Sequence, residues 1–150
     1  MKANAHALAR YAALCQEAQI VPIVEPEVLM DGPHCTHSLE RCSEVTEWVL
    51  TTVFQELYEA GVVLEGMVLK PNMVVPGQKA LKQVSRKEVA AQTVKILKRT
   101  VPAAVPGIAF LSGGQTDEDA TAHLSLINGM GGPCPGGSRS PMAVRCKPRR

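Results

Sequence analysis

The stretch EGMVLKPNMVVPG, residues 65–77, contains an apolar run that ends in Lys70 and is followed at once by Pro71. Proline biases the preceding residue toward extended backbone, so Lys70 is predicted to be the last residue of a strand. Burial disfavours the ammonium form of a lysine, and a neutral amine attacks carbonyls to form Schiff bases. A lysine that ends a buried strand also commonly extends its ammonium to water. Taken alone, the stretch predicts a strand end and leaves its chemistry open.

A second apolar run, Ile20 to Val28, ends in Glu25 and Glu27. Residues two apart on a strand share a face and lie roughly 7 Å apart. One carboxylate could then exchange protons while the other orients an amine. The bland alternative is that both glutamates simply face water.

A third apolar run, Gly107 to Gly114, ends in Ser112, Gly113 and Gly114. A hydroxyl and glycine N–H groups just before a helix suit a phosphate group. All three runs place polar groups at the carboxyl end, which is where parallel-sheet enzymes have their active sites. Three coincident polar strand ends favour a functional interpretation over a purely structural one.

Strand-like and helix-like segments alternate along the chain. Leu8, Tyr11, Cys15 and Ala18 recur at helical spacing, and Ser85 begins an S-x-x-E capping box. Alternation of this kind predicts an α/β fold with a parallel sheet. A complete β/α barrel takes about 250 residues, so 150 residues accommodate only part of one. The predicted helices are about 4–18, 39–60, 85–100 and 116–128, and the predicted strands are 20–25, 66–70 and 108–111.

Four motifs together resemble class I fructose-bisphosphate aldolase, the Schiff-base type, between about Ala3 and Asn128: LARYAALCQ, VPIVEPEVL, LEGMVLKPNMVVPG and KRTVPAAVPGIAFLSGGQ. The resemblance implies a partial TIM (β/α)8 barrel that holds three of the eight parallel strands, the fifth to the seventh. It also implies reversible cleavage of fructose 1,6-bisphosphate to dihydroxyacetone phosphate and glyceraldehyde 3-phosphate in glycolysis. We expect residues 1–128 to form this partial barrel.

The resemblance also assigns roles to the three strand ends. Lys70 matches the Schiff-base lysine, Glu25 the acid and base of imine formation, and Glu27 the residue that orients the lysine. Ser112 and Gly113 match residues that hold a substrate phosphate. The family needs no metal and no other cofactor, its members are cytoplasmic, and a complete version is expected to form a homo-oligomer. The substrate is a phosphorylated sugar.

The tail, residues 129–150, departs from the family pattern and is expected to be disordered. One choice of codons for Pro133 to Lys147, read in a shifted frame, encodes LPWRLTFSYGRALQ, which matches the eighth-strand segment of the family. We therefore hypothesise that a frameshift replaced the native carboxyl end, and that the chain is an internal-to-C-terminal fragment. The tail has five basic residues and no acidic ones. The formal net charge of the whole chain is +2, so residues 1–128 have a net charge of −3. Without aromatic residues or a binding fold, the tail does not indicate nucleic-acid binding.

The cysteines, the histidines and the hydropathy of the chain limit the kind of protein further. The chain has five cysteines at irregular spacing and no signal-peptide pattern, which is typical of reduced thiols in the cytoplasm. His34, Cys35, His37 and Cys42 follow no tetrahedral zinc spacing, so a solvated loop is the better interpretation. No apolar stretch is long enough to span a bilayer. The chain by itself is expected to be inactive, and the alternative function is a non-catalytic fragment or association module.

Overall fold

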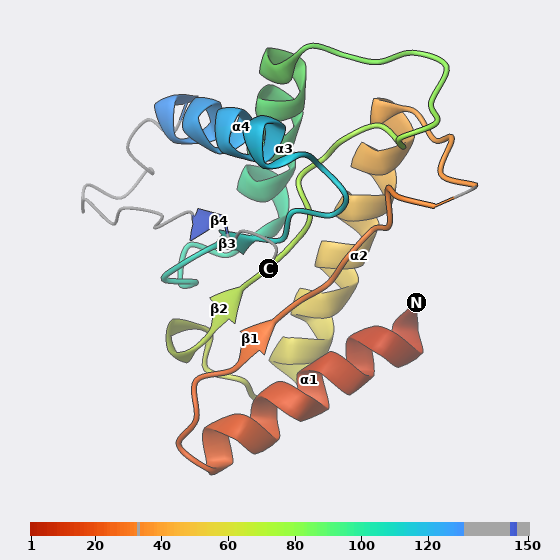
Figure 1. Ribbon diagram of the computed structural model, residues 1–150. Coiled ribbons are helices and arrows are strands. Elements are labelled where there is room, and N and C mark those ends of the chain that lie inside the picture. The colour runs from red at the N-terminus through yellow and green to blue at the C-terminus, as the bar shows by residue number, and fades with distance from the viewer. Residues whose placement is uncertain (33, 131–144, 147–150) are drawn as a thin grey trace.

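The computed structural model describes residues 1–32, 34–130 and 145–146, and its element order confirms the predicted alternation of helices and strands (Figure 1). The elements are α1 (Lys2–Glu17), β1 (Ile23–Val24), α2 (Leu39–Glu59), a 3₁₀ turn η1 (Leu64–Gly66), β2 (Val68–Leu69), α3 (Arg86–Thr100), β3 (Ala109–Phe110), α4 (Asp117–Met130) and β4 (Arg145–Cys146). Within these described residues, no helix is long and apolar enough to cross a membrane.

The strands run parallel and lie side by side in chain order. In β1 and β2, Ile23 pairs with Val68, and the next residue of each strand continues the register. A parallel bridge between Leu69 and Ile108 joins β2 to the chain entering β3, and β3 pairs with β4. β1 is shorter than predicted because Pro22 and Pro26 flank it and supply no N–H to the ladder, whereas β2 begins later than predicted because Leu64–Gly66 form the 3₁₀ turn η1.

The helices pack on one side of this sheet, each against the next along the chain (Figure 1). Val24, Leu69 and Phe110 are fully buried. Ile23 points to the opposite face because side chains alternate along a strand, and it is 51% exposed. Parallel sheets usually have both faces covered, so the face that carries Ile23 is unusual in being open within the described residues.

Local sequence signals explain where two of the helices begin. Ser38 accepts a hydrogen bond from the Arg41 backbone N–H at the start of α2. Ser85 and Glu88 form both bonds of a capping box at the start of α3, as predicted. These caps satisfy backbone N–H groups that have no partner inside the helix.

The helical repeat of Leu8, Tyr11, Cys15 and Ala18 is not the buried face of α1. Ala5, Ala9 and Ala12 are buried against the rest of the molecule, whereas Tyr11 and Leu14 are exposed. Small side chains let α1 approach α2 closely. The face of α1 that is buried is therefore the one with the smallest side chains, not the one with the largest apolar side chains.

The tail contains one element that the sequence did not predict. Residues 145–146 form β4 alongside β3, although the segment carries no strand pattern. Helix α4 continues to Met130, just beyond the predicted boundary at Asn128. The remainder of the predicted disordered, frameshifted tail, 131–144 and 147–150, lies outside the described residues.

Candidate active site

Lys70 and Glu25 form an ion pair at the carboxyl ends of β2 and β1. The Lys70 Nζ donates to Glu25 Oε1 at 2.6 Å. The strand register produces this contact, because Val24 lies opposite Leu69 and the next residue of each strand falls at the same level. The Lys70 side chain is 25% exposed and that of Glu25 is 44% exposed. The pair is therefore accessible from the open face of the sheet.

Glu27 lies on the same side of the chain as Glu25. Both glutamates are exposed and the intervening Pro26 is buried, so the alternation of β1 continues beyond its last residue. The two glutamates line one groove of about 620 Å³. Its walls are mostly apolar and come from α1 and α2, including Leu8 and Val49. The structure thus places both predicted carboxylates beside one cavity and puts Glu25 in contact with the lysine.

The turn after β3 requires its two glycines. Gly113 and Gly114 have φ angles of +54° and +79°, in the left-handed region that favours glycine. A Cβ on Gly113 would lie 2.8 Å from Met30 Cε, and one on Gly114 would lie 2.8 Å from Asp31 Cβ. The half-buried Ser112 precedes them. The turn therefore packs closely against the loop that follows β1.

The glycine turn and the ion pair lie at the same edge of the sheet. The Leu111 N–H donates to the Pro71 carbonyl at 3.2 Å, which places Ser112 next to the chain leaving Lys70. Among the described residues, no side-chain hydrogen bond joins Ser112 to Lys70 or to Glu25. The structure thus brings Lys70 and Glu25 into contact and leaves the serine-glycine turn as a separate part of the same edge.

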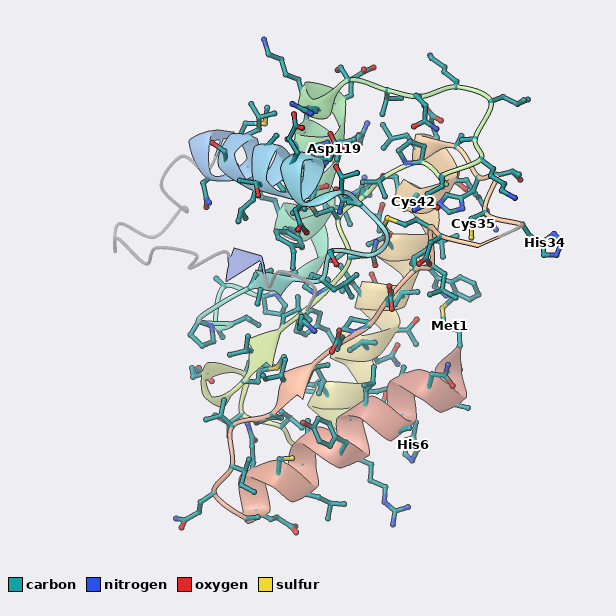
Figure 2. All side chains as sticks on the ribbon, in the orientation of Figure 1. Met1, His6, His34, Cys35, Cys42 and Asp119 are labelled. Carbon is teal, nitrogen blue, oxygen red and sulfur yellow. The ribbon has the colours of Figure 1, made fainter. Side chains whose placement is uncertain are left out.

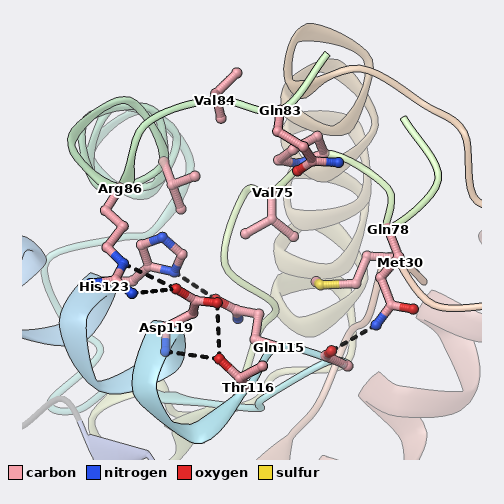
Figure 3. A pocket seen from close by; sticks show the side chains of 13 residues that line it. Met30, Val75, Gln78, Gln83, Val84, Arg86, Gln115, Thr116, Asp119 and His123 are labelled. Atoms are coloured by element: carbon pink, nitrogen blue, oxygen red, sulfur yellow. Dashed lines mark hydrogen bonds and ion pairs between the residues drawn. The ribbon is translucent and has the colours of Figure 1, made fainter. Parts of the chain in front are cut away.

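A second cavity, of about 440 Å³, lies between the amino ends of α3 and α4 (Figure 3). Arg86 donates to Asp119 Oδ1 at 3.0 Å and to Glu118 Oε1 at 3.1 Å. His123 Nδ1 lies 2.6 Å from Gln115 Oε1. Two carboxylates surround one guanidinium, and this balance makes the cavity a poor site for a phosphate.

Two groups in this cavity have shifted pKa values. Hydrogen bonds from the Thr116 hydroxyl, and then from Arg86, lower the pKa of Asp119. Burial lowers the pKa of His123, and the nearby Asp119 carboxylate partly opposes that shift. The native state therefore binds a proton at His123 less readily than the unfolded chain does.

We expect His123 to make the fold less stable under mildly acidic conditions. Its folded-state pKa is below the unfolded value of about 6.5, so its contribution is fully present above that pH and is lost as the pH falls toward the folded pKa. Urea unfolding at several pH values between about 7.5 and 5 should show a steeper loss of unfolding free energy for wild type than for His123→Gln. Equal slopes in the two proteins would contradict the assignment.

The histidine and cysteine side chains in and after the loop before α2 do not point toward one common site. His34 projects away from the molecule, whereas Cys42 lies within α2 and is 1% exposed (Figure 2). The Cys35 Sγ donates to the Asp31 carbonyl at 2.9 Å. In the part of the chain that the structure describes, no three His, Cys, Asp or Glu side chains are arranged to hold a metal ion.

Comparisons with known proteins identify the family. The family model "Glycolytic: Fructose-bisphosphate aldolase class-I" matches residues 1–135. "Probable fructose-bisphosphate aldolase class 1" of Xanthomonas axonopodis is 58% identical over 131 residues, which are 87% of this chain and 38% of that protein. "Fructose-bisphosphate aldolase 4, cytosolic" of Arabidopsis thaliana is 52% identical over 132 residues, 88% of this chain and 33% of that protein.

A solved structure agrees with these matches. The fructose-bisphosphate aldolase of Plasmodium falciparum, crystallised with TRAP and a small-molecule inhibitor, aligns with a TM-score of 0.84 and 46% identity. The alignment covers 95% of this chain and 39% of that one, so the chain is an α/β fragment that aligns to part of an aldolase. It spans between a third and two fifths of the length of these relatives. This chain belongs to the class I fructose-bisphosphate aldolase family.

Proposed function

We propose that this chain carries the Schiff-base portion of a fructose-bisphosphate aldolase active site. The observation that carries the proposal is the 2.6 Å contact between Lys70 Nζ and Glu25 Oε1 at neighbouring strand ends. A nucleophilic amine needs a proton acceptor within hydrogen-bond reach, and this carboxylate is within reach. The family membership supplies the substrate class, a phosphorylated sugar.

The chemistry follows from these two groups. After giving a proton to Glu25, the Lys70 amine adds to the ketone carbon of fructose 1,6-bisphosphate to form a carbinolamine. Glu25 then returns a proton to the carbinolamine hydroxyl, which leaves as water and produces an iminium. Glu25, a carboxylate again after water has left, takes the proton of the fourth-carbon hydroxyl, and the electron pair of the bond between the third and fourth carbons passes to the iminium as that bond breaks. Glyceraldehyde 3-phosphate is released and an enamine remains on Lys70. The enamine takes a proton at the third carbon, and hydrolysis of the resulting iminium yields dihydroxyacetone phosphate.

The other strand-end residues have supporting roles in this proposal. Glu27 shares the groove with Glu25 and orients the lysine. Ser112 and Gly113 receive a substrate phosphate, because a hydroxyl and turn amides at this edge are suitable donors. The iminium supplies the electron withdrawal that a metal ion provides in metal-dependent chemistry, so the steps above require none.

The proposed activity requires segments of the aldolase barrel beyond those that this chain matches. We infer that β1, β2 and β3 correspond to the fifth, sixth and seventh strands of a TIM barrel. The relatives are between two and three times as long, so the remaining strands and phosphate contacts lie in the segments that this chain does not match. A complete version would be a cytoplasmic homo-oligomer that acts on fructose 1,6-bisphosphate.

Borohydride trapping tests the assignment of Lys70. In a chimera, residues 1–130 replace the matching segment of the Plasmodium falciparum aldolase. Fructose 1,6-bisphosphate or dihydroxyacetone phosphate with borohydride should leave a reduced adduct on Lys70, because borohydride captures the iminium. Peptide mass spectrometry locates the adduct. An adduct on the loop residues Lys79 or Lys82, with Lys70 unmodified, would refute the assignment.

A non-catalytic association module is the second candidate. The observation that favours it is the outer edge of β1, which among the described residues pairs with β2 alone and beside which Ile20, Val21 and Ile23 are exposed. Such an edge is a template for pairing with another polypeptide. Lys70-dependent turnover in the chimera supports the enzyme, whereas a folded chimera without turnover supports the association module.

A further inference from the structure

Asn72 is a buried polar residue that connects three segments near the candidate site. It is 3% exposed. Its Oδ1 accepts from the Val28 N–H at 3.0 Å, and its Nδ2 donates to Thr46 Oγ1 at 3.2 Å and to the Met73 carbonyl at 3.0 Å. A buried amide with these partners joins the chain after β1, helix α2 and the loop after β2, so its orientation is well defined.

The backbone ladder between β1 and β2 stops at the candidate site. Its last bond runs from the Lys70 N–H to the Val24 carbonyl at 2.7 Å. The next N–H of this ladder would come from residue 26, which is a proline and has none, so the ladder cannot continue there. Pro71 faces the other neighbour, where its carbonyl accepts from Leu111. Any further hydrogen bond between the two chains must therefore come from another group.

The Asn72 side chain provides the next link between the two strands. On the β1 side, the last backbone bond is at Val24 and the Asn72 bond is at Val28, so Glu25 lies between them. On the β2 side, the same two bonds are at Lys70 and Asn72. The glutamate is therefore held on both sides. Without the outer link, the last backbone bond to β2 would lie before Glu25, at the Val24 carbonyl.

We propose that Asn72 is a positioning residue that holds Glu25 beside the Lys70 amine by binding the Val28 N–H. Its contribution to catalysis rests on the function proposed above, whereas the positioning itself is a property of this chain. A hydrogen-bonded amide fixes the distance between an acid–base group and its nucleophile, and small displacements of such groups are costly. Asn72 would touch neither substrate nor the reacting atoms.

Reductive methylation of the 150-residue chain tests this role without a sugar substrate. Formaldehyde and cyanoborohydride methylate accessible amines, and mass spectrometry gives the initial rate at Lys70 relative to the exposed Lys98. Asn72→Leu and Glu25→Gln should each raise the Lys70 rate by about fivefold, because each releases the amine from its ion pair. The double variant should show no further increase, since both changes remove one interaction.

Thr46→Val serves as the control. It removes one acceptor of the Asn72 amide but keeps the bonds of that amide to Val28 and Met73, so the Lys70 rate should stay within about twofold of wild type. An unchanged rate in Asn72→Leu, or effects of Asn72→Leu and Glu25→Gln that multiply, would overturn the proposal.

A measurement on wild type guards against loss of the fold in Asn72→Leu. Alkylation of the buried Cys42 reports global unfolding of each variant. If Asn72→Leu unfolds, hydrogen exchange of the Val28 amide in wild type provides the test. Exchange about a hundredfold slower than in an unstructured peptide supports the hydrogen bond to Asn72, and exchange at the unstructured rate refutes it. Trapping in the chimera remains a separate readout. If no adduct forms on Lys70 in the chimera, but Asn72→Leu and Glu25→Gln still raise the methylation rate without adding to each other, the proposed function is refuted and the positioning stands. If the adduct forms but Asn72→Leu leaves the methylation rate unchanged, only the positioning is refuted.

Discussion

Replacing Lys70 by alanine in the Plasmodium falciparum chimera is expected to reduce kcat/KM for fructose 1,6-bisphosphate cleavage by at least about 10⁴-fold, because no other group in the site can form the iminium. Glu25→Gln should keep the lysine but remove its proton acceptor. The expected loss for that variant is about 10²- to 10⁴-fold, the usual contribution of a general acid–base group. Coupled assay of glyceraldehyde 3-phosphate release measures both.

The matched control is Lys98→Ala. This lysine is exposed in α3, away from the strand ends, so removing it should leave kcat/KM within about twofold of the parent chimera. The two Lys→Ala changes make the same chemical alteration and differ only in position. Activity that survives Lys70→Ala at the level of Lys98→Ala would show that the nucleophile lies elsewhere.

The 150-residue chain by itself is expected to show no cleavage of fructose 1,6-bisphosphate above its own Lys70→Ala variant. In the described residues, the Lys70 and Glu25 side chains are 25% and 44% exposed, so water reaches both. Exclusion of water and alignment of the substrate normally contribute several orders of magnitude each, and the open face of the sheet supplies neither. The chain also matches only 39% of the aldolase whose structure it resembles.

Concentrated protein and long incubation make this test stringent, with the Lys70→Ala chain as the background. Circular dichroism should first show that both chains retain the helices α1 to α4. Lys70-dependent turnover by the chain alone would mean that the strand ends seen here suffice for catalysis, and it would contradict the expectation that a larger assembly is needed.

The sequence by itself determined the alternation of helices and strands from α1 to α4 and the residues at the strand ends, but not β4. Local signals were sufficient because they act over a few residues: Pro71 stops a strand after Lys70, and the Ser85 capping box starts α3 where predicted. The glycine pair at 113–114 was interpreted from the sequence only as a source of N–H groups, and its left-handed backbone is a finding of the structure. The proposed roles of these residues came from the family resemblance and remain predictions.

The tertiary structure alone decided which of these signals meet. The Lys70–Glu25 contact depends on a strand register between residues 45 positions apart, which no local pattern encodes. The burial of Ala9 in place of Tyr11 on α1 depends on how closely α2 approaches. The sequence placed Asn72 only in the loop that follows Lys70, because its three hydrogen bonds exist only once β1, α2 and the loop after β2 are packed together. Periodicity and capping depend on neighbours along the chain, whereas register and buried hydrogen bonds depend on neighbours in space.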